Sequence, residues 1–182
     1  MHEAFEVRVV SGAEIEEADI ERMACFYRST CRRYGAWDYL NEGMWDWLAR
    51  HGTEHVVLFL AEQEGATVAG SFCIRGQDTL WGRYWGSQEE IDCLHFEVCY
   101  YAPIQWAIEQ RLDCFDPGAG GSHKRRRGFV ARPHASLHRW YEPQMDGLIR
   151  AWLAKVNGLM LEEIEAINAE LPFKADAPEL SL

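Results

Sequence analysis

The sequence His55-Val-Val-Leu-Phe-Leu-Ala61 is a continuous apolar run, which predicts a central strand of a sheet. Two further strands are predicted at residues 67–74 and 79–85, because polar turns at 62–66 and 75–78 separate the three runs. Strands joined by such short turns form an antiparallel meander. This meander is the part of the sequence that decides the fold.

Two details of the meander predict its local geometry. Gly70, inside the second strand, indicates either a β-bulge or a close backbone approach. In the third strand, simple alternation places Trp81, Arg83 and Trp85 on one face and Leu80, Gly82 and Tyr84 on the other.

Helices are predicted on both sides of the meander. Gly35 is a natural stop for a helix at 17–34, and Asn41 can cap a helix at 42–50 that buries Met44, Trp45 and Leu48. Pro103 is expected to kink a helix at 96–112 or to start its second half, and Gly158 is a position that could divide the long helix at 142–170. With short strands at 5–10 and 113–116, the order of elements predicts an α+β fold, a sheet flanked by helices.

Length and charge limit the classes of protein. The 182 residues suit one domain, with a core over about 15–173 and a loose tail at 174–182. The formal net charge of −11 argues against general binding to nucleic acids or anionic membranes. We see no signal peptide and no membrane span, so we expect a cytoplasmic protein. The six cysteines form no CxxC pair or zinc pattern, which predicts buried, reduced thiols and no metal site.

Positive charge is gathered in one glycine-rich segment, Asp116-Pro-Gly-Ala-Gly-Gly-Ser-His-Lys-Arg-Arg-Arg-Gly-Phe129. Glycines can turn backbone N–H groups toward one point and form an anion-binding nest, and arginine grips phosphate oxygens in pairs. The alternative is a solvated basic loop. Neither a GxGxxG nor a Walker motif is present, so the segment predicts a phosphate-bearing ligand without naming it.

Two more motifs carry candidate chemistry. Arg83, which stands among aromatic residues on a strand in Gly82-Arg-Tyr-Trp-Gly86, is either a cation stacked in a wall or a substrate clamp. His95-x-Glu97 matches part of a deaminase zinc signature, but no Pro-Cys-x-x-Cys follows. His95 or Glu97 could serve as a general base; alternatively His95 packs and Glu97 is solvated or paired.

Four motifs together resemble the bacterial FemAB-like family. They are Leu80-Trp-Gly-Arg-Tyr-Trp-Gly86, Leu94-His-Phe-Glu-x-Cys-Tyr-Tyr101, Phe115-Asp-Pro-Gly-Ala-x-Gly121 and His123-Lys-x-x-Arg-Gly-Phe129. That family comprises predicted N-acyltransferases of the GNAT fold, named for peptidoglycan biosynthesis. The resemblance implies a mixed, mostly antiparallel sheet with a splayed acyl-binding groove. It also implies that this chain corresponds to the C-terminal half of a protein with two GNAT-like halves, so that an N-terminal half is a possible partner.

The resemblance also implies roles. In related aminoacyl transferases of cell-wall synthesis, a Lys near a Gly-Phe lies close to the reacting groups, which Lys124 with Gly128-Phe129 resembles. The family pattern has Gln and Glu where this chain has Gly120 and Ser122, and Gln-Gly where it has Ala102-Pro103. If the missing Glu is the base, the domain recognises its ligand without catalysis.

The leading hypothesis is transfer of an acyl or aminoacyl group to an amine, with a peptidoglycan precursor as a candidate acceptor. We expect no bound cofactor; the donor is aminoacyl-tRNA or an acyl-CoA, and the expected partner is one of these or a phosphate-bearing small molecule. The alternatives are a non-catalytic half-domain that recognises a phosphorylated cell-wall precursor and an acetyl-CoA-dependent acetyltransferase. The candidate catalytic residues are Lys124, Glu97, His95 and His123. The candidate substrate-binding residues are Arg83, Tyr84, Trp85, Tyr100, Tyr101, Gly118, Gly120, Gly121, Arg125, Arg127, Gly128 and Phe129.

Overall fold

The computed structural model describes residues 5–89 and 91–172. The chain divides into two compact units, Met1–Ala119 and Gly120–Leu182. The prediction of a single domain stays a prediction, as does that of a core over about 15–173. The tail at 174–182 lies outside the described residues.

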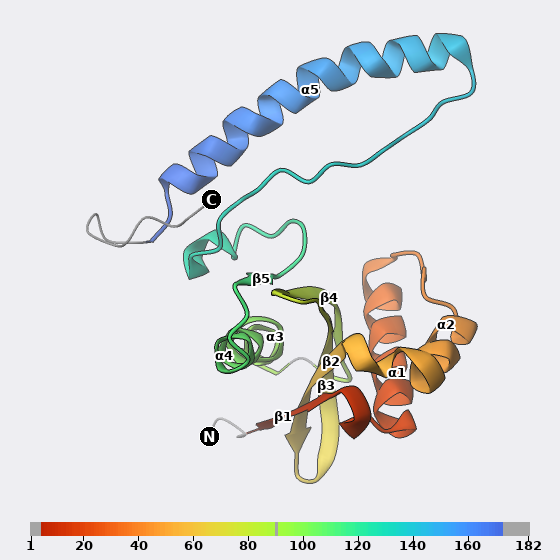
Figure 1. Cartoon of the computed structure of the whole chain (residues 1–182), viewed down its shortest axis with the longest axis vertical. Helices are drawn as coiled ribbons and strands as arrows, with labels where there is room; N and C mark the ends of the chain where they lie inside the picture. Colours follow the sequence, from red (N-terminus) through yellow and green to blue (C-terminus); the bar gives the residue numbers. More distant parts are fainter. Residues whose placement is uncertain (1–4, 90, 173–182) are drawn as a thin grey trace. The chain divides into compact units, whose positions relative to one another are not determined.

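The first unit is built on a five-stranded sheet with the strand order β1-β2-β3-β4-β5 (Figure 1). The first four strands are antiparallel and β5 runs parallel to β4. This confirms the predicted meander and the mixed, mostly antiparallel sheet of an α+β fold. The strands are β1 (Glu6–Ser11), β2 (Val56–Gln63), β3 (Ala66–Arg75), β4 (Thr79–Ser87) and β5 (Cys114–Asp116).

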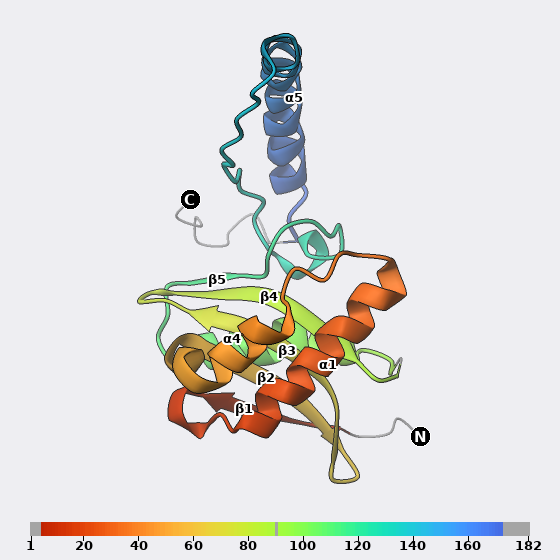
Figure 2. The same cartoon turned by 90° about the vertical axis from the view of Figure 1, so that its right-hand side faces the viewer.

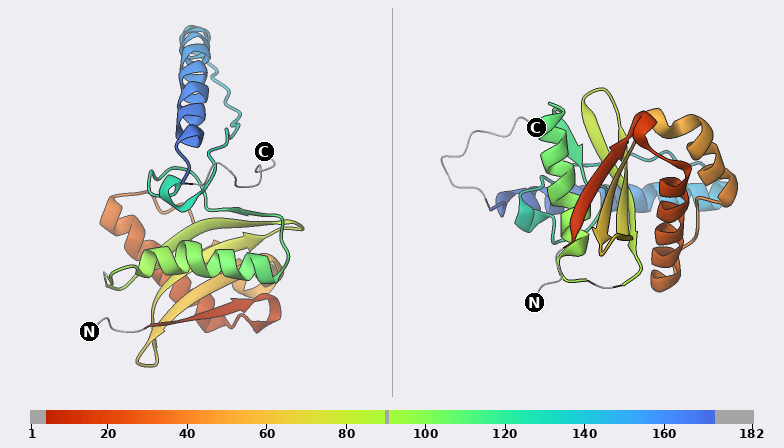
Figure 3. Two further views of the ribbon diagram at one scale, coloured as in Figure 1. Left: turned by 90° about the vertical axis from the view of Figure 1, so that its left-hand side faces the viewer. Right: turned by 90° about the horizontal axis from the view of Figure 1, so that it is seen from below.

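Helices cover both faces of this sheet (Figures 2 and 3). One face carries α1 (Glu17–Tyr34) and α2 (Glu42–Trp47), and α2 runs on into a π-helical turn at Leu48–Gly52. The other face carries α3 (Leu94–Phe96), a π-helical segment (Glu97–Tyr101) and α4 (Ala102–Glu109). Short 3-10 turns lie at Gly12–Glu14 and Thr53–His55.

Two hydrophobic cores hold the layers together, one on each face of the sheet. β2 is buried from Val56 to Ala61 and contributes alternate side chains to both, which confirms the predicted central strand. Leu58 and Leu60 pack with α1 and α2, whereas Val57 and Phe59 pack with Val98 and the α4 residues.

The helix ends follow the predicted caps. Gly35 ends α1 in the left-handed conformation with φ of 62°, and the Asn41 side chain accepts a hydrogen bond from the Met44 N–H at the start of α2. Trp45 and Leu48 are buried as predicted, but Met44 is exposed. The prediction for Met44 was wrong because the face of α2 that carries it stands over an open pocket, described below.

A β-bulge changes which residues of β4 share a face. Tyr84 pairs with Phe72 and Gly82 with Cys73, so Arg83 is an extra residue without a partner in β3. A bulge of this kind inverts the alternation beyond it. Leu80 therefore packs in the core beneath α4, whereas Tyr84 packs in the core beneath α1, so the predicted sharing of faces along this strand was wrong. Gly70 is not the bulge, because the register of its strand shifts elsewhere, but it does lie close to the Leu60 side chain.

Pro103 shapes the helix on the other face, as predicted, by standing in the first turn of α4. In the π-helical segment before it, the Ala102 N–H bonds to the Glu97 carbonyl, five residues back. The same spacing would give the Val98 carbonyl the N–H of residue 103, which proline lacks. The buried Ser71 hydroxyl of β3 donates to this carbonyl instead, and so attaches the helix to the sheet.

The second unit contains a 3-10 turn (Arg125–Arg127), an extended segment and α5 (Pro143–Ala169). Pro143 stands in the first turn as predicted, and α5 is one continuous helix that Gly158 does not divide. Asn168 hydrogen-bonds both to the N–H and to the carbonyl of Ala131, and Arg125 forms an ion pair with Glu170. These contacts attach the basic segment to the last turn of α5.

The cysteines are all free, but only Cys31 and Cys73 are buried. The prediction of buried thiols was wrong for Cys25, Cys93 and Cys114, which stand on an exposed helix face, before α3 and on the edge strand. Burial raises the pKa of the Cys73 thiol to about 12, so this thiol stays protonated and unreactive at neutral pH.

Candidate functional site

The sheet opens between β4 and β5. Their parallel pairing covers only three positions and ends where Trp81 faces Asp116. The next residue of the β5 chain is Pro117, which has no N–H with which to continue the ladder. Gly118 then turns the chain away with φ of 85°. From Gly82 to Ser87, β4 therefore has no strand partner on this side among the described residues.

An unpaired strand edge can bind an extended ligand. It presents N–H and C=O groups that such a ligand satisfies as an added strand would. Gly82 sits at the point of divergence, where a side chain would meet the Pro117 backbone at 3.4 Å. The divergence matches the splay of the sheet that the resemblance implied; binding of an acyl group there stays a prediction.

Aromatic side chains gather on the α3 side of this part of β4. The rings of Trp85 and His95 lie 4.4 Å apart, and His95 also contacts Tyr100 at 5.4 Å between centroids. The π-helical segment brings together residues five apart in sequence. The His95 ring therefore packs against its neighbours, as one of the two alternatives predicted. A role of His95 as a base stays a prediction. The same holds for Glu97, which is half-buried.

The segment that enters α3 is acidic. Glu89 and Asp92 are exposed just before the helix begins at Leu94, and residues 87–98 contain no Lys or Arg. The N-terminus of a helix favours anions because its N–H groups point outward. Here neighbouring carboxylates oppose that preference.

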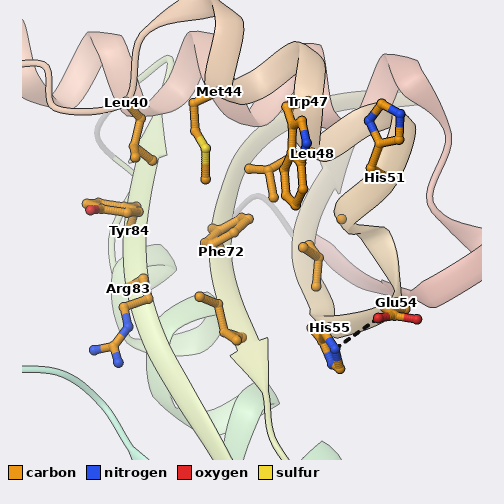
Figure 4. A pocket seen from close by; sticks show the side chains of 13 residues that line it. Leu40, Met44, Trp47, Leu48, His51, Glu54, His55, Phe72, Arg83 and Tyr84 are labelled. Atoms are coloured by element: carbon orange, nitrogen blue, oxygen red, sulfur yellow. Dashed lines mark ion pairs between the residues drawn. The ribbon is translucent and has the colours of Figure 1, made fainter.

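On the opposite face, α2 and the sheet line an open pocket of about 430 Å³ (Figure 4). Met44 and Trp47 line it from α2, and Phe72 and Tyr84 from the sheet. Arg83 stands at its edge, and an ion pair between His55 and Glu54 lies at another part of its lining. Arg83 and Tyr84 thus line this pocket, whereas Trp85 belongs to the cluster on the other face.

The glycine loop carries the backbone geometry of a nest only in part. Gly118, Gly120 and Gly121 all have positive φ, a conformation that favours glycine. The Gly118 N–H donates to the Asp116 carboxylate at 2.8 Å, so this group is already occupied. At Gly121 a side chain would meet the His123 imidazole at 2.7 Å.

In the second unit, the predicted cations are held in different ways. Arg127 donates to the His123 carbonyl at 3.0 Å and Arg125 pairs with Glu170. Gly128 closes the 3-10 turn with φ of 82°, and the Phe129 N–H donates to the Lys124 carbonyl. Desolvation first, and then the charges of Lys124 and Arg127, lower the pKa of His123, so this imidazole is neutral at pH 7 and able to accept a proton.

Sequence reasoning missed most of the pocket. Met44 and Trp47 lie in the predicted helix at 42–50 and Phe72 in the predicted strand at 67–74, and no pocket was predicted from them. With Leu40 they line one pocket with Arg83 and Tyr84. A signal was available in α2, where Met44 and Trp47 add a second apolar face to a short helix. Tyr100 lies in the cluster with His95, and its neighbour Tyr101 is exposed.

Comparison with protein families gives a match over residues 1–175 to the FemAB-like family, which is described as one of peptidoglycan biosynthesis and recognition. The chain belongs to the FemAB-like family. None of the curated proteins matches the sequence significantly. The resemblance inferred from the four motifs is confirmed.

Solved structures show the fold of this FemAB-like protein. An aminoglycoside acetyltransferase, meta-AAC0020, from an uncultured soil metagenomic sample, in complex with sisomicin, matches 76% of this chain and 95% of its own, with 12% identity and a TM-score of 0.53. The aminoglycoside N-acetyltransferase AAC(6')-Iy in complex with CoA matches 76% and 96%, with 9% identity and a TM-score of 0.51. A possible acetyltransferase from Clostridium difficile 630 matches 76% and 99%, with 10% identity and a TM-score of 0.53.

These acetyltransferases share the GNAT fold, which confirms the predicted fold. Family and fold together support an N-acyltransferase. Among the described residues, no helix is both long and apolar enough to cross a membrane. Within the same residues, no three His, Cys, Asp or Glu side chains come together as metal ligands.

Proposed function

We propose that this protein is an N-acyltransferase that moves an aminoacyl group from an ester donor, such as aminoacyl-tRNA, to an amine. The observation that carries the acyl-transfer part is the divergence of β4 from β5 after Trp81 and Asp116. It provides an unpaired strand edge on which an extended donor can lie. Membership of the FemAB-like family and the GNAT fold support the same reaction class.

The reaction needs a base and an oxyanion donor. The amine nitrogen attacks the ester carbonyl carbon, a C–N bond forms, the C–O bond to the donor breaks, and the amine proton passes to the released hydroxyl. Glu97 or His95 is proposed to accept this proton first, with His123 as the remaining candidate because its imidazole is neutral. Lys124 or the N–H groups of Gly120 and Gly121 are proposed to stabilise the oxyanion. These roles rest on residue chemistry and on the motifs; loss of transfer in Lys124→Ala, with the folded state retained, is the expected result.

The acidic segment before α3 favours aminoacyl-tRNA over an acyl-CoA as the donor. An acyl-CoA carries a pyrophosphate, which binds well at a helix N-terminus. Glu89 and Asp92 stand just before this one, and like charges this close repel. The cations of the chain are concentrated instead at Lys124–Arg127, which suits the phosphates of a nucleic-acid donor despite the net negative charge.

Calorimetry with acetyl-CoA and with aminoacyl-tRNA tests this choice of donor. We expect binding of the aminoacyl-tRNA that weakens steeply with salt, and no measurable binding of acetyl-CoA. The double variant Glu89→Lys/Asp92→Lys should gain affinity for acetyl-CoA. Tight binding of acetyl-CoA by the unmodified protein, with transfer to an amine, would overturn the aminoacyl assignment.

The non-catalytic function has one observation in its favour, the exposed Ser122 at the position where the family pattern has Glu. It predicts that a phosphorylated cell-wall precursor binds while neither donor supports transfer. A transfer assay with both donors, run beside the calorimetry, distinguishes it from the proposed enzyme.

A further inference from the structure

The pocket between α2 and the sheet has the shape and chemistry of a small-molecule site. Its volume is about 430 Å³, within the range of ligand pockets. Most of the lining is apolar or aromatic, with the Leu40, Met44, Trp47, Phe72 and Tyr84 side chains around one space (Figure 4). Trp47 is half exposed although it is large and apolar, and a pocket with an exposed ring favours an apolar ligand.

The wall of this pocket is fixed before any ligand arrives. The Tyr27 hydroxyl accepts the N–H groups of Tyr39 and Leu40 at 2.9 and 3.3 Å. The Trp45 indole N–H donates to the Leu40 carbonyl at 3.2 Å. The connection between α1 and α2 is therefore held from beneath, which lowers the entropy cost of binding.

One cation stands at the edge of the pocket without a protein partner. Arg83 is exposed, and among the described residues it forms no hydrogen bond or ion pair. Its guanidinium points away from the Met44 and Trp47 side chains (Figure 4). A ligand that fits both features has an apolar body inside the pocket and an anionic group at the mouth, beside Arg83.

The same residue is also at the opening of the sheet. Arg83 is the bulged residue of β4 and directly follows Gly82, where β4 and β5 diverge. A carboxylate on Arg83 would therefore hold an amine attached to the same carbon close to the unpaired edge of β4. An α-amino acid is the simplest molecule that has this arrangement of groups.

We propose that this pocket binds the amine acceptor, an α-amino acid with a large apolar side chain, with its carboxylate on Arg83 and its side chain among Met44, Trp47 and Phe72. The inference rests on the proposed function for the identity of the ligand as acceptor, but the binding itself does not require catalysis. A free carboxylate is essential to it, so the N-terminus of a peptide is excluded.

Displacement of the fluorescent dye 1-anilinonaphthalene-8-sulfonate tests the proposal, because the dye combines an aromatic body with an anion. L-tryptophan should displace it about tenfold better than L-tryptophanamide, which keeps the amine and the ring but lacks the carboxylate. Arg83→Gln should reduce this preference to within about twofold. Trp47→Ala should weaken both ligands, and Arg22→Gln, an exposed arginine of α1 outside the pocket, should change neither.

Each result has a separate meaning. Equal displacement by the two ligands in the unmodified protein would overturn the carboxylate assignment. An unchanged affinity in both Arg83→Gln and Trp47→Ala would show that the ligand lies elsewhere and overturn the proposal. Aminoacyl-tRNA binding measured in the same variants reports on the proposed function alone. A failure of the proposed function is thereby distinguished from a failure of the amino-acid site.

Discussion

The two units of this chain hold their candidate functional residues by different means. In the first unit, β4 lies between two buried cores. Its Trp85 packs against His95, which also contacts Tyr100 on the helix that is attached to the sheet. In the second unit, α5 has no buried residue, and the basic segment is held by Asn168, Arg125 and a few backbone bonds. Burial fixes side chains closely, whereas a few exposed polar contacts fix them weakly. The comparison implies that the same substitution has different consequences in the two units.

The largest contrast is expected from glycine-to-alanine substitutions. In Gly86→Ala the new Cβ would lie 2.1 Å from the Phe26 carbonyl oxygen of α1, a backbone clash that should cost at least about 3 kcal/mol of the free energy of unfolding. In Gly158→Ala nothing lies within 4 Å, and α5 should gain roughly 0.5–1 kcal/mol. Chemical denaturation followed by far-UV circular dichroism measures both. Similar changes in the free energy of unfolding for the two variants would contradict the difference that we expect between the two units.

Ser71→Ala should cause the next largest loss, about 1–3 kcal/mol of the free energy of unfolding, because it leaves the Val98 carbonyl without a donor. A double-mutant cycle with Pro103→Ala sharpens the test. Alanine at 103 restores an N–H that can reach this carbonyl, so Ser71→Ala should cost less in that background. Additive effects in urea unfolding would show that Ser71 does not compensate for the proline.

In the second unit, Asn168→Ala removes two hydrogen bonds to the Ala131 backbone. We expect a local loss of roughly 1 kcal/mol, seen as faster amide hydrogen exchange at Ala131 and in the last turn of α5. Exchange in β2 should not change. Asn157→Ala, in the middle of the same helix, is the matched control, and equal effects from the two variants would refute a specific role for Asn168.

The smallest effect concerns the pH dependence contributed by His123. Its folded-state pKa is lowered, so between this value and the ordinary value of about 6.5 the unfolded chain binds more protons. Stability should fall as the pH drops through this window, and His123→Asn should flatten the slope. Titration of the imidazole by NMR measures the pKa directly, with His134→Asn as the control for the unfolding curves. A pKa at or above the ordinary value would contradict the effect of Lys124 and Arg127.

Much of the architecture could be predicted because local physical chemistry fixes it. The apolar run at 55–61, the Gly35 stop and the Asn41 cap predicted a central strand and two helix ends that the structure confirms. The Leu80–Phe129 motifs pointed to the FemAB-like family, and the family match confirms it. The predicted catalytic and binding roles stay predictions.

The sequence by itself determined the order of the elements, the family and the concentration of positive charge at Lys124–Arg127, since all three are properties of neighbouring residues. Only the tertiary structure decided which side chains meet. One extra residue at Arg83 inverted the faces of β4 and separated Tyr84 from Leu80, because side-chain direction in a strand depends on register with its neighbour. The pocket beneath α2 joins Leu40 to Tyr84, and that distance along the chain is closed by packing alone.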